Sequence, residues 1–316
     1  MSRTPAVTSR SEQIRCWRDQ LRLTRPRQWP ILSVQLAVGV LCAPAVRSAI
    51  TADADLSWVS LGAAWFAWVV GLNGGTLAFN SAYDRDVEDV AYLSAPPEPP
   101  PGTARNALLL MTVGTVLGLA AGTLFAMITA VCVLLSVLYS HPRTRLKGVP
   151  GADLAVNALG YGVGTTLAGL VAGAHAAGAS TAPDPGGWWL SCGFGLLFGS
   201  FYPMTQLYQI EADRERGDRT LASALGVRSS LALASALGLG AAFCLSRAFT
   251  SWGESLAAPA ASGIVWVVFC SIWWVKSGGM SPGDHQRWMY RGLGVWALVD
   301  VVLLIGALSR PLGLSA

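Results

Sequence analysis

The chain has 316 residues, of which 53% are hydrophobic and only 13% are charged, and its formal net charge is +4. About a quarter of the residues in an ordinary soluble domain are charged, so this composition excludes that class. The six cysteines occur singly, without the paired spacing of a metal site or a disulfide framework.

Apolar runs long enough to cross a bilayer recur along the chain and predict an all-α polytopic membrane protein. A basic arm, residues 1–27, comes first and is too long for a signal peptide. Residues 28–316 are predicted to form a single integral-membrane domain with about nine transmembrane helices. The nine predicted spans cover residues 28–46, 57–81, 104–119, 121–140, 152–173, 187–208, 228–248, 258–277 and 289–308.

The positions of lysine and arginine predict the orientation. All of the 22 basic residues except Arg47, Arg247 and Arg310 fall in the N-terminal arm or in the alternate loops on the same side. Positive charge is retained in the cytoplasm, so we expect a cytoplasmic N-terminus. The net charge therefore reflects topology, and nucleic-acid binding is not expected.

Two acidic clusters, 80–89 and 209–218, each follow an apolar span on the predicted cytoplasmic side. In both, an amide is followed four residues later by an aspartate and then by an arginine. These residues are Asn80, Asp84 and Arg85 in the first cluster, and Gln209, Asp213 and Arg214 in the second. Repeated spacing of this kind favours two clusters that face each other across a cavity.

Dense carboxylates at one membrane surface suit a magnesium–diphosphate complex. Mg²⁺ binds one or two carboxylates and completes its shell with substrate phosphates and water. If the first helix continues beyond the membrane edge, Asn80, Asp84 and Glu88 lie on one face. An amide side chain at Asn80 or Gln209 offers the metal an oxygen or a phosphate an N–H donor.

Ionisation of an allylic diphosphate also needs cations near the leaving group and an apolar, aromatic cavity for the carbocation. The segment Arg143–Lys147 supplies cations, Tyr83 and Tyr139 belong to a group of aromatic residues at span ends, and Asn157 in span five is positioned to face the cavity. The plainer alternative is that the acidic clusters are solvated loops and the basic residues contact lipid headgroups.

The sequence from about Leu21 to Gly226 resembles the UbiA superfamily of intramembrane prenyltransferases. The four segments that carry the resemblance are Leu21–Trp29, Asn80–Glu88, Tyr139–Asp153 and Gln209–Gly226. The resemblance implies helices around a central cavity, Mg²⁺ as cofactor, ionisation of an isoprenoid diphosphate, and prenyl transfer to a lipophilic acceptor. That acceptor is an aromatic, a quinone precursor or another isoprenoid.

The residue patterns and the resemblance together predict three groups of site residues. The predicted catalytic residues are Asn80, Asp84, Asp213 and Tyr139. The predicted substrate-binding residues are Arg25, Arg145, Lys147, Asn157, Tyr83, Gln209 and Arg214. The predicted metal ligands are Asp84, Glu88, Asp213 and Asp218.

Three departures from the family pattern leave alternatives open. Ser81, Glu88 and Gln209 stand where the family usually has aspartate, so the number of bound Mg²⁺ ions is undetermined. Relatives of this kind resemble terpene cyclases, in which the cation is captured within its own chain. A secondary transporter and a prenyl-lipid scaffold are the hypotheses from other classes. Transporters place their sites near the bilayer midplane, whereas most charges here gather at one edge.

Overall fold

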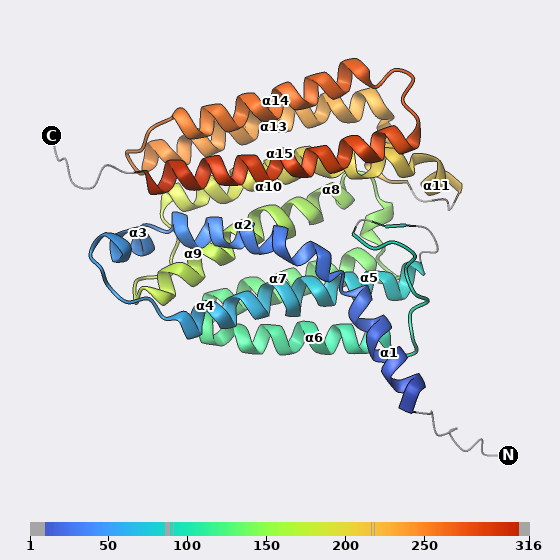
Figure 1. Cartoon of the computed structure of the whole chain (residues 1–316), viewed down its shortest axis with the longest axis horizontal. Helices are drawn as coiled ribbons and strands as arrows, with labels where there is room; N and C mark the ends of the chain where they lie inside the picture. Colours follow the sequence, from blue (N-terminus) through green and yellow to red (C-terminus); the bar gives the residue numbers. More distant parts are fainter. Residues whose placement is uncertain (1–9, 86–88, 91, 216, 218, 310–316) are drawn as a thin grey trace.

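The structure, a computed structural model, describes residues 10–85, 89–90, 92–215, 217 and 219–309. This part of the chain is helical and contains no strand, which confirms the all-α prediction (Figure 1). The long helices are α2 (Trp29–Cys42), α6 (Thr103–Leu117), α7 (Thr123–Ser140), α10 (Pro185–Gln206), α13 (Val227–Ser251), α14 (Ala257–Lys276) and α15 (Pro282–Leu308).

Two further long helices are continuous but contain a π-helical segment. The first joins α4 (Trp58–Trp65), the π-helical segment Phe66–Gly74 and α5 (Gly75–Asp84). The second joins α8 (Ala152–Asn157), the π-helical segment Ala158–Gly164 and α9 (Thr165–Ala176). The shorter helices are α1 (Arg10–Leu23), α3 (Pro44–Thr51), α11 (Ile210–Glu215) and α12 (Leu221–Leu225).

Within the described residues, seven helices are long and apolar enough to cross a membrane, or up to eight if each bent pair is one span. The multi-pass membrane class is therefore confirmed, while nine spans and a cytoplasmic N-terminus stay predictions. α10 is not among the seven. Most of its residues are buried inside the bundle, so it needs less apolar surface than a lipid-facing helix.

The first predicted span, 28–46, needs a correction. α2 ends at Cys42 because Ala43 is extended and precedes Pro44, and a residue before proline is disfavoured in the helical region. α3 then leaves at an angle of 71°.

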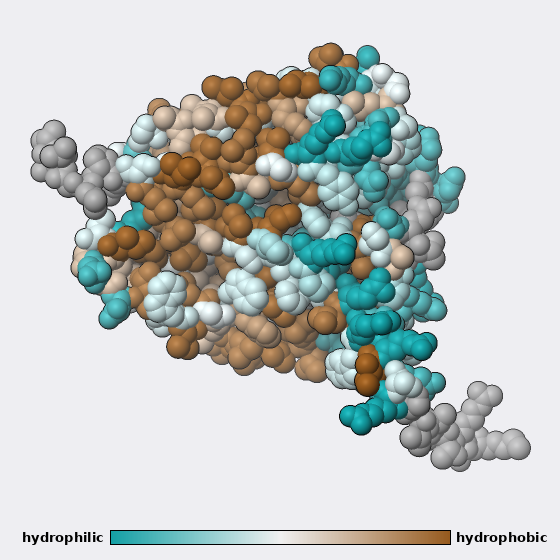
Figure 2. All heavy atoms as spheres, in the orientation of Figure 1, coloured by the Kyte–Doolittle hydropathy of each residue, from teal (hydrophilic) through white to brown (hydrophobic). Residues whose placement is uncertain are grey.

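The helices form two packed groups joined by α2 and α9 (Figure 1). α10, α13, α14 and α15 surround the larger hydrophobic core, and α2, α4, α7 and α9 contribute to a second one. Apolar side chains cover a broad band of the surface, and polar ones gather at the end near α1 and α11 (Figure 2). This distribution suits a bundle that is surrounded by lipid.

α2 and α9 approach each other so closely that their backbones touch at Gly39 and Gly169. A Cβ atom on Gly39 would lie 2.5 Å from the carbonyl oxygen of Thr166 and 2.9 Å from the Cα of Gly169. Small residues allow this approach in membrane bundles, where packing replaces the hydrophobic effect between helices.

We expect Gly39→Ala to lower the free energy of unfolding by about 1–3 kcal/mol, the usual cost of overpacking, because backbone atoms cannot yield as a flexible side chain can. The melting temperature in detergent micelles measures the effect. Gly62→Ala is the matched control, since that helical position is exposed and no atom lies within 4 Å of its added Cβ. Equal melting temperatures for both variants would contradict the packing argument.

Candidate active site

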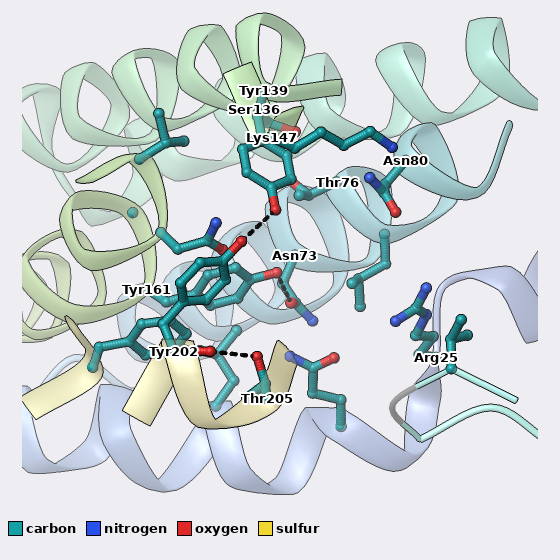
Figure 3. Close-up of a pocket in the computed structure, with 18 of the residues that line it drawn as sticks. Arg25, Asn73, Thr76, Asn80, Ser136, Tyr139, Lys147, Tyr161, Tyr202 and Thr205 are labelled. Carbon is teal, nitrogen blue, oxygen red and sulfur yellow. Dashed lines mark hydrogen bonds between the residues drawn. The ribbon is translucent and has the colours of Figure 1, made fainter. Parts of the chain in front are cut away.

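A cavity of about 410 Å³ opens among the spans and is lined by ten of the predicted site residues (Figure 3). These residues are Arg25, Asn80, Tyr83, Asp84, Tyr139, Arg145, Lys147, Asn157, Gln209 and Asp213. They come from segments up to 188 positions apart in sequence, from Arg25 to Asp213. The two acidic clusters therefore face one cavity, as their repeated spacing predicts.

The first cluster meets the basic loop at the polar end of the cavity. Asp84, the last residue of α5, forms an ion pair with Lys147, and both side chains are largely buried. Asn80, one turn earlier, donates a hydrogen bond from Nδ2 to Oγ of Ser140 at 3.2 Å. A carboxylate, an ammonium group and an amide are thereby held at neighbouring positions.

The second cluster contributes Asp213 from the short helix α11. This aspartate is 4% exposed, and its Oδ2 accepts a hydrogen bond from Oγ1 of Thr220 at 3.1 Å. The same Thr220 hydroxyl oxygen caps α12 by accepting from the backbone N–H of Ser223. Asp213 is therefore oriented by a residue that also fixes the next helix.

A fully buried aspartate on α8, Asp153, connects its own segment to α10 and to α12. Its Oδ1 accepts from the backbone N–H of Gly151 and Leu154, and its Oδ2 accepts from Nε2 of Gln206 and the N–H of Leu221. All four distances lie between 2.8 and 3.0 Å. A buried carboxylate is stable when donors satisfy its oxygens in this way. Asp153 thus ties the segment after the basic loop to α10 and α12.

Three stacked rings, Tyr161, Phe198 and Tyr202, line the cavity and are called here the aromatic wall. Ring centroids are 5.3 Å apart for Tyr161 and Phe198 and 6.4 Å apart for Phe198 and Tyr202. Both hydroxyl groups are bonded: Tyr161 donates to Oδ1 of Asn73 at 3.1 Å, and the oxygens of Tyr202 and Tyr139 lie 2.8 Å apart. Figure 3 shows Tyr161 and Tyr202 with the bonds from their hydroxyl groups to Asn73 and Tyr139.

Both π-helical segments border this cavity and supply Asn73 and Tyr161. The wider turns of the π-helical segments interrupt the regular backbone hydrogen bonds of the α-helix. Nε2 of Gln35 donates to the carbonyl oxygen of Tyr161 at 2.6 Å and to that of Gly162 at 3.3 Å. π-helical segments occur frequently at functional sites because they re-aim side chains.

Two arginines at the cavity, Arg25 and Arg145, have left-handed backbone conformations, with φ of 51° and 39°. Such conformations are uncommon for residues other than glycine and cluster at functional sites. Tyr92 lies in the loop nearby, where burial and the neighbouring phenols of Tyr290 and Tyr208 raise its pKa. Its phenol therefore remains a neutral hydrogen-bond donor at physiological pH.

Some predicted residues are not brought to the cavity. Arg214 is exposed and donates to the carbonyl oxygen of Ser223, because it follows Asp213 directly and points to another side of α11. The shared helix face of Asn80, Asp84 and Glu88 depended on a helix that continues beyond the membrane edge, and this condition is not met, since α5 ends at Asp84 and Arg85 is left-handed. Glu88 and Asp218 themselves lie outside the described residues.

Sequence reasoning missed several lining residues, although helical spacing from the motifs could have found them. Tyr161 and Thr165 lie four and eight residues after Asn157, and Thr76 lies four residues before Asn80. Residues spaced by four share a helix face, so these positions follow from the motif residues. Asp153 was noted within a motif, but its joining role required the fold.

The model of the UbiA prenyltransferase family matches residues 37–292. The chain belongs to this family. The match confirms the resemblance found in the sequence. No curated protein matches the chain in sequence.

Solved structures share the fold at low identity. A structure of digeranylgeranylglyceryl phosphate synthase is 15% identical, with a TM-score of 0.67, over 93% of this chain and 99% of the other. A UbiA homologue from Archaeoglobus fulgidus bound to GPP and Mg²⁺ is 18% identical, with a TM-score of 0.63, over 92% and 99%. The same homologue bound to DMAPP and Mg²⁺ is 18% identical, with a TM-score of 0.64, over 93% and 100%.

We expect Asp153→Asn to lower the free energy of unfolding by about 1–3 kcal/mol, because an amide N–H would face donors that now contact a carboxylate. Thermal melting in detergent measures the loss. Asp55→Asn, at an exposed position, is the control. A double-mutant cycle with Gln206→Ala should reveal coupling between the two residues, and strictly additive effects would argue against the network.

Proposed function

We propose that this protein ionises an isoprenoid diphosphate with the help of Mg²⁺ and transfers the prenyl group to a lipophilic acceptor within the membrane. We further propose that the site faces the cytoplasm. The observation that carries the proposal is one cavity with two chemically different parts. Carboxylates, cations and an amide occupy one part, and the aromatic wall borders the other.

The donor set fits a metal that is shared with a substrate. Asp84 and Asp213 line the same cavity, and Mg²⁺ commonly takes one or two carboxylates and completes its shell with phosphate oxygens and water. Among the described residues, no three histidine, cysteine or acidic side chains are grouped to hold a metal by themselves. This arrangement suits Mg²⁺ that arrives with a diphosphate. When bound, the metal would offset the negative charge that grows on the leaving group.

The residues of the chain have distinct proposed roles in the first step. The carbon–oxygen bond of the allylic diphosphate breaks, and its electron pair remains on the diphosphate oxygen. Lys147, Arg145 and Arg25 place positive charge beside that leaving group. Asn80 offers an amide, which can donate to a phosphate oxygen or present its own oxygen to the metal.

The aromatic wall then faces the allylic cation. Aromatic faces attract cations, and an apolar cavity excludes the water that would quench them. A lipophilic acceptor attacks the cation, a new bond forms at the allylic carbon, and the acceptor gives up a proton to the departing diphosphate. The wall also favours a second outcome, intramolecular cyclisation, in which a double bond of the same chain takes the place of the acceptor.

We expect Asp84→Asn and Asp213→Asn each to reduce diphosphate release at least about 100-fold, a loss typical for removing an electrostatic group from a reacting centre. Release is measured with purified protein, Mg²⁺ and prenyl diphosphates of 10 to 20 carbons, with and without a membrane-lipid extract as the source of acceptor.

The matched control is Glu215→Gln, an exposed carboxylate that ends the same short helix as Asp213. It should keep the wild-type rate. Wild-type rates in the Asp84 or Asp213 variant would remove the basis for the metal assignment. Cyclic products formed without the lipid extract would favour the cyclase over the transferase.

Removal of divalent cations provides a separate test. With an excess of chelator, we expect diphosphate release to stop, because the divalent charge that would offset the growing charge on the leaving group is then missing. Added Mg²⁺ should restore the rate, and a melting curve with chelator should show that the fold persists. Unchanged release without divalent cations would contradict Mg²⁺ dependence.

A further inference from the structure

One helix traces the cavity from its polar end to its far end. Trp68, Leu72, Thr76, Asn80 and Asp84 all line the cavity and follow one another at intervals of four residues. Residues four positions apart are neighbours along the surface of a helix, so these five form a continuous row. Trp68 precedes Asp84 by sixteen positions, so the two lie at most about 24 Å apart along the axis at 1.5 Å per residue.

Trp68 is held firmly at the far end. Its side chain is 1% exposed, and its indole Nε1–H donates to Oγ1 of Thr165 at 3.1 Å. The ring of the fully buried Phe125 stands edge-on behind it, with centroids 5.9 Å apart. The tryptophan is therefore fixed both by a hydrogen bond and by a ring contact.

Cys132 completes this end of the cavity from a third helix. A Cβ atom added to Gly164 would lie 3.0 Å from Sγ of Cys132 and 3.5 Å from the Trp68 ring, so both side chains meet at this glycine. Trp68, Cys132 and Thr165 each line the cavity, and we call these three residues the cavity floor. They lie on the helix Trp58–Asp84, on α7 and on α9.

We propose that the cavity floor sets the length of the prenyl chain and that the substrate is a prenyl diphosphate of no more than four isoprene units. This inference rests on the proposed function, because it places the diphosphate near Asp84 and Lys147 and directs the hydrocarbon chain past the aromatic wall. The floor then stands where the tail ends.

The dimensions support this limit. An extended hydrocarbon chain advances about 1.3 Å per bond, given a carbon–carbon bond length of about 1.5 Å. The sixteen main-chain carbons of a four-unit chain need about 20 Å, and the twenty of a five-unit chain need about 25 Å. The depth of at most about 24 Å must also hold the diphosphate. A chain of three units fits extended, a chain of four fits when slightly folded, and a chain of five does not.

The test compares diphosphate release from C10, C15, C20 and C25 prenyl diphosphates, with Mg²⁺ and a membrane-lipid extract. Wild-type protein should release diphosphate from the C25 compound at least about tenfold more slowly than from the C15 compound, as expected for an overfilled pocket. Trp68→Leu and the milder Trp68→Phe remove volume from the floor. Both should raise the C25:C15 rate ratio at least about threefold.

A filling variant tests the same site in the opposite direction. Cys132→Leu adds volume to the floor and should lower the C20:C10 rate ratio. Trp58→Leu is the matched control, because that tryptophan begins the same long helix and is 75% exposed. It should leave both ratios unchanged. A purely structural role for Trp68 would lower every rate together and would not shift a ratio.

The outcomes separate the two proposals. Turnover by wild-type protein with unchanged ratios in the Trp68 and Cys132 variants would overturn the role of the floor and leave the proposed function standing. That result would mean that the tail leaves the cavity sideways. Failure of wild-type protein to release diphosphate from all four compounds would overturn both. If Trp68→Leu does not fold, Trp68→Phe and Cys132→Leu decide the matter.

Discussion

The absence of water inside a bilayer is the constraint on which the site depends. A polar group that is buried without a partner costs several kcal/mol, so a polar cavity there calls for side chains that bond to one another. The pairs observed here meet this demand: Lys147 with Asp84, Asn73 with Tyr161, and Gln206 with Asp153. Each pair joins segments that are far apart in sequence. The same bonds therefore lower the cost of burying these polar groups and hold the helices together around the cavity.

Backbone geometry serves the same constraint. The two π-helical segments redirect Asn73 and Tyr161 toward each other, and Gln35 satisfies the carbonyl oxygens of Tyr161 and Gly162. Glycines at the contact of α2 with α9 bring Gln35 within reach of that segment. Close packing and irregular helix geometry are therefore linked, because a wider separation of the two helices would move the Gln35 donor away from those carbonyl groups.

Much of the site could be predicted because its chemistry leaves marks in the sequence. Charged residues are rare in this apolar chain, so Asp84 and Asp213 are conspicuous in the sequence. The same spacing of amide, aspartate and arginine around each of them predicted a shared cavity, which both residues line. The ends of helices were harder to predict. Arg85 adopts a left-handed conformation that nothing in its type demands, and it ends α5 before Glu88. Tyr161, Phe198 and Trp68 were missed because aromatic residues are common in membrane helices and only the packing shows which of them face a cavity.

The hydroxyl bonds that fix the aromatic wall determine which substitutions change its mobility. Hydrogen bonds hold the rim of the wall at the hydroxyl groups of Tyr161 and Tyr202, whereas the ring carbons take no part in these bonds. Exchange of tyrosine for phenylalanine at either position would loosen a ring without altering the surface that it presents. The hydroxyl oxygen thus determines how rigidly the ring is held, and the ring carbons determine the apolar surface that it presents. A change of one oxygen atom can therefore alter the mobility of the wall while its rings stay in place.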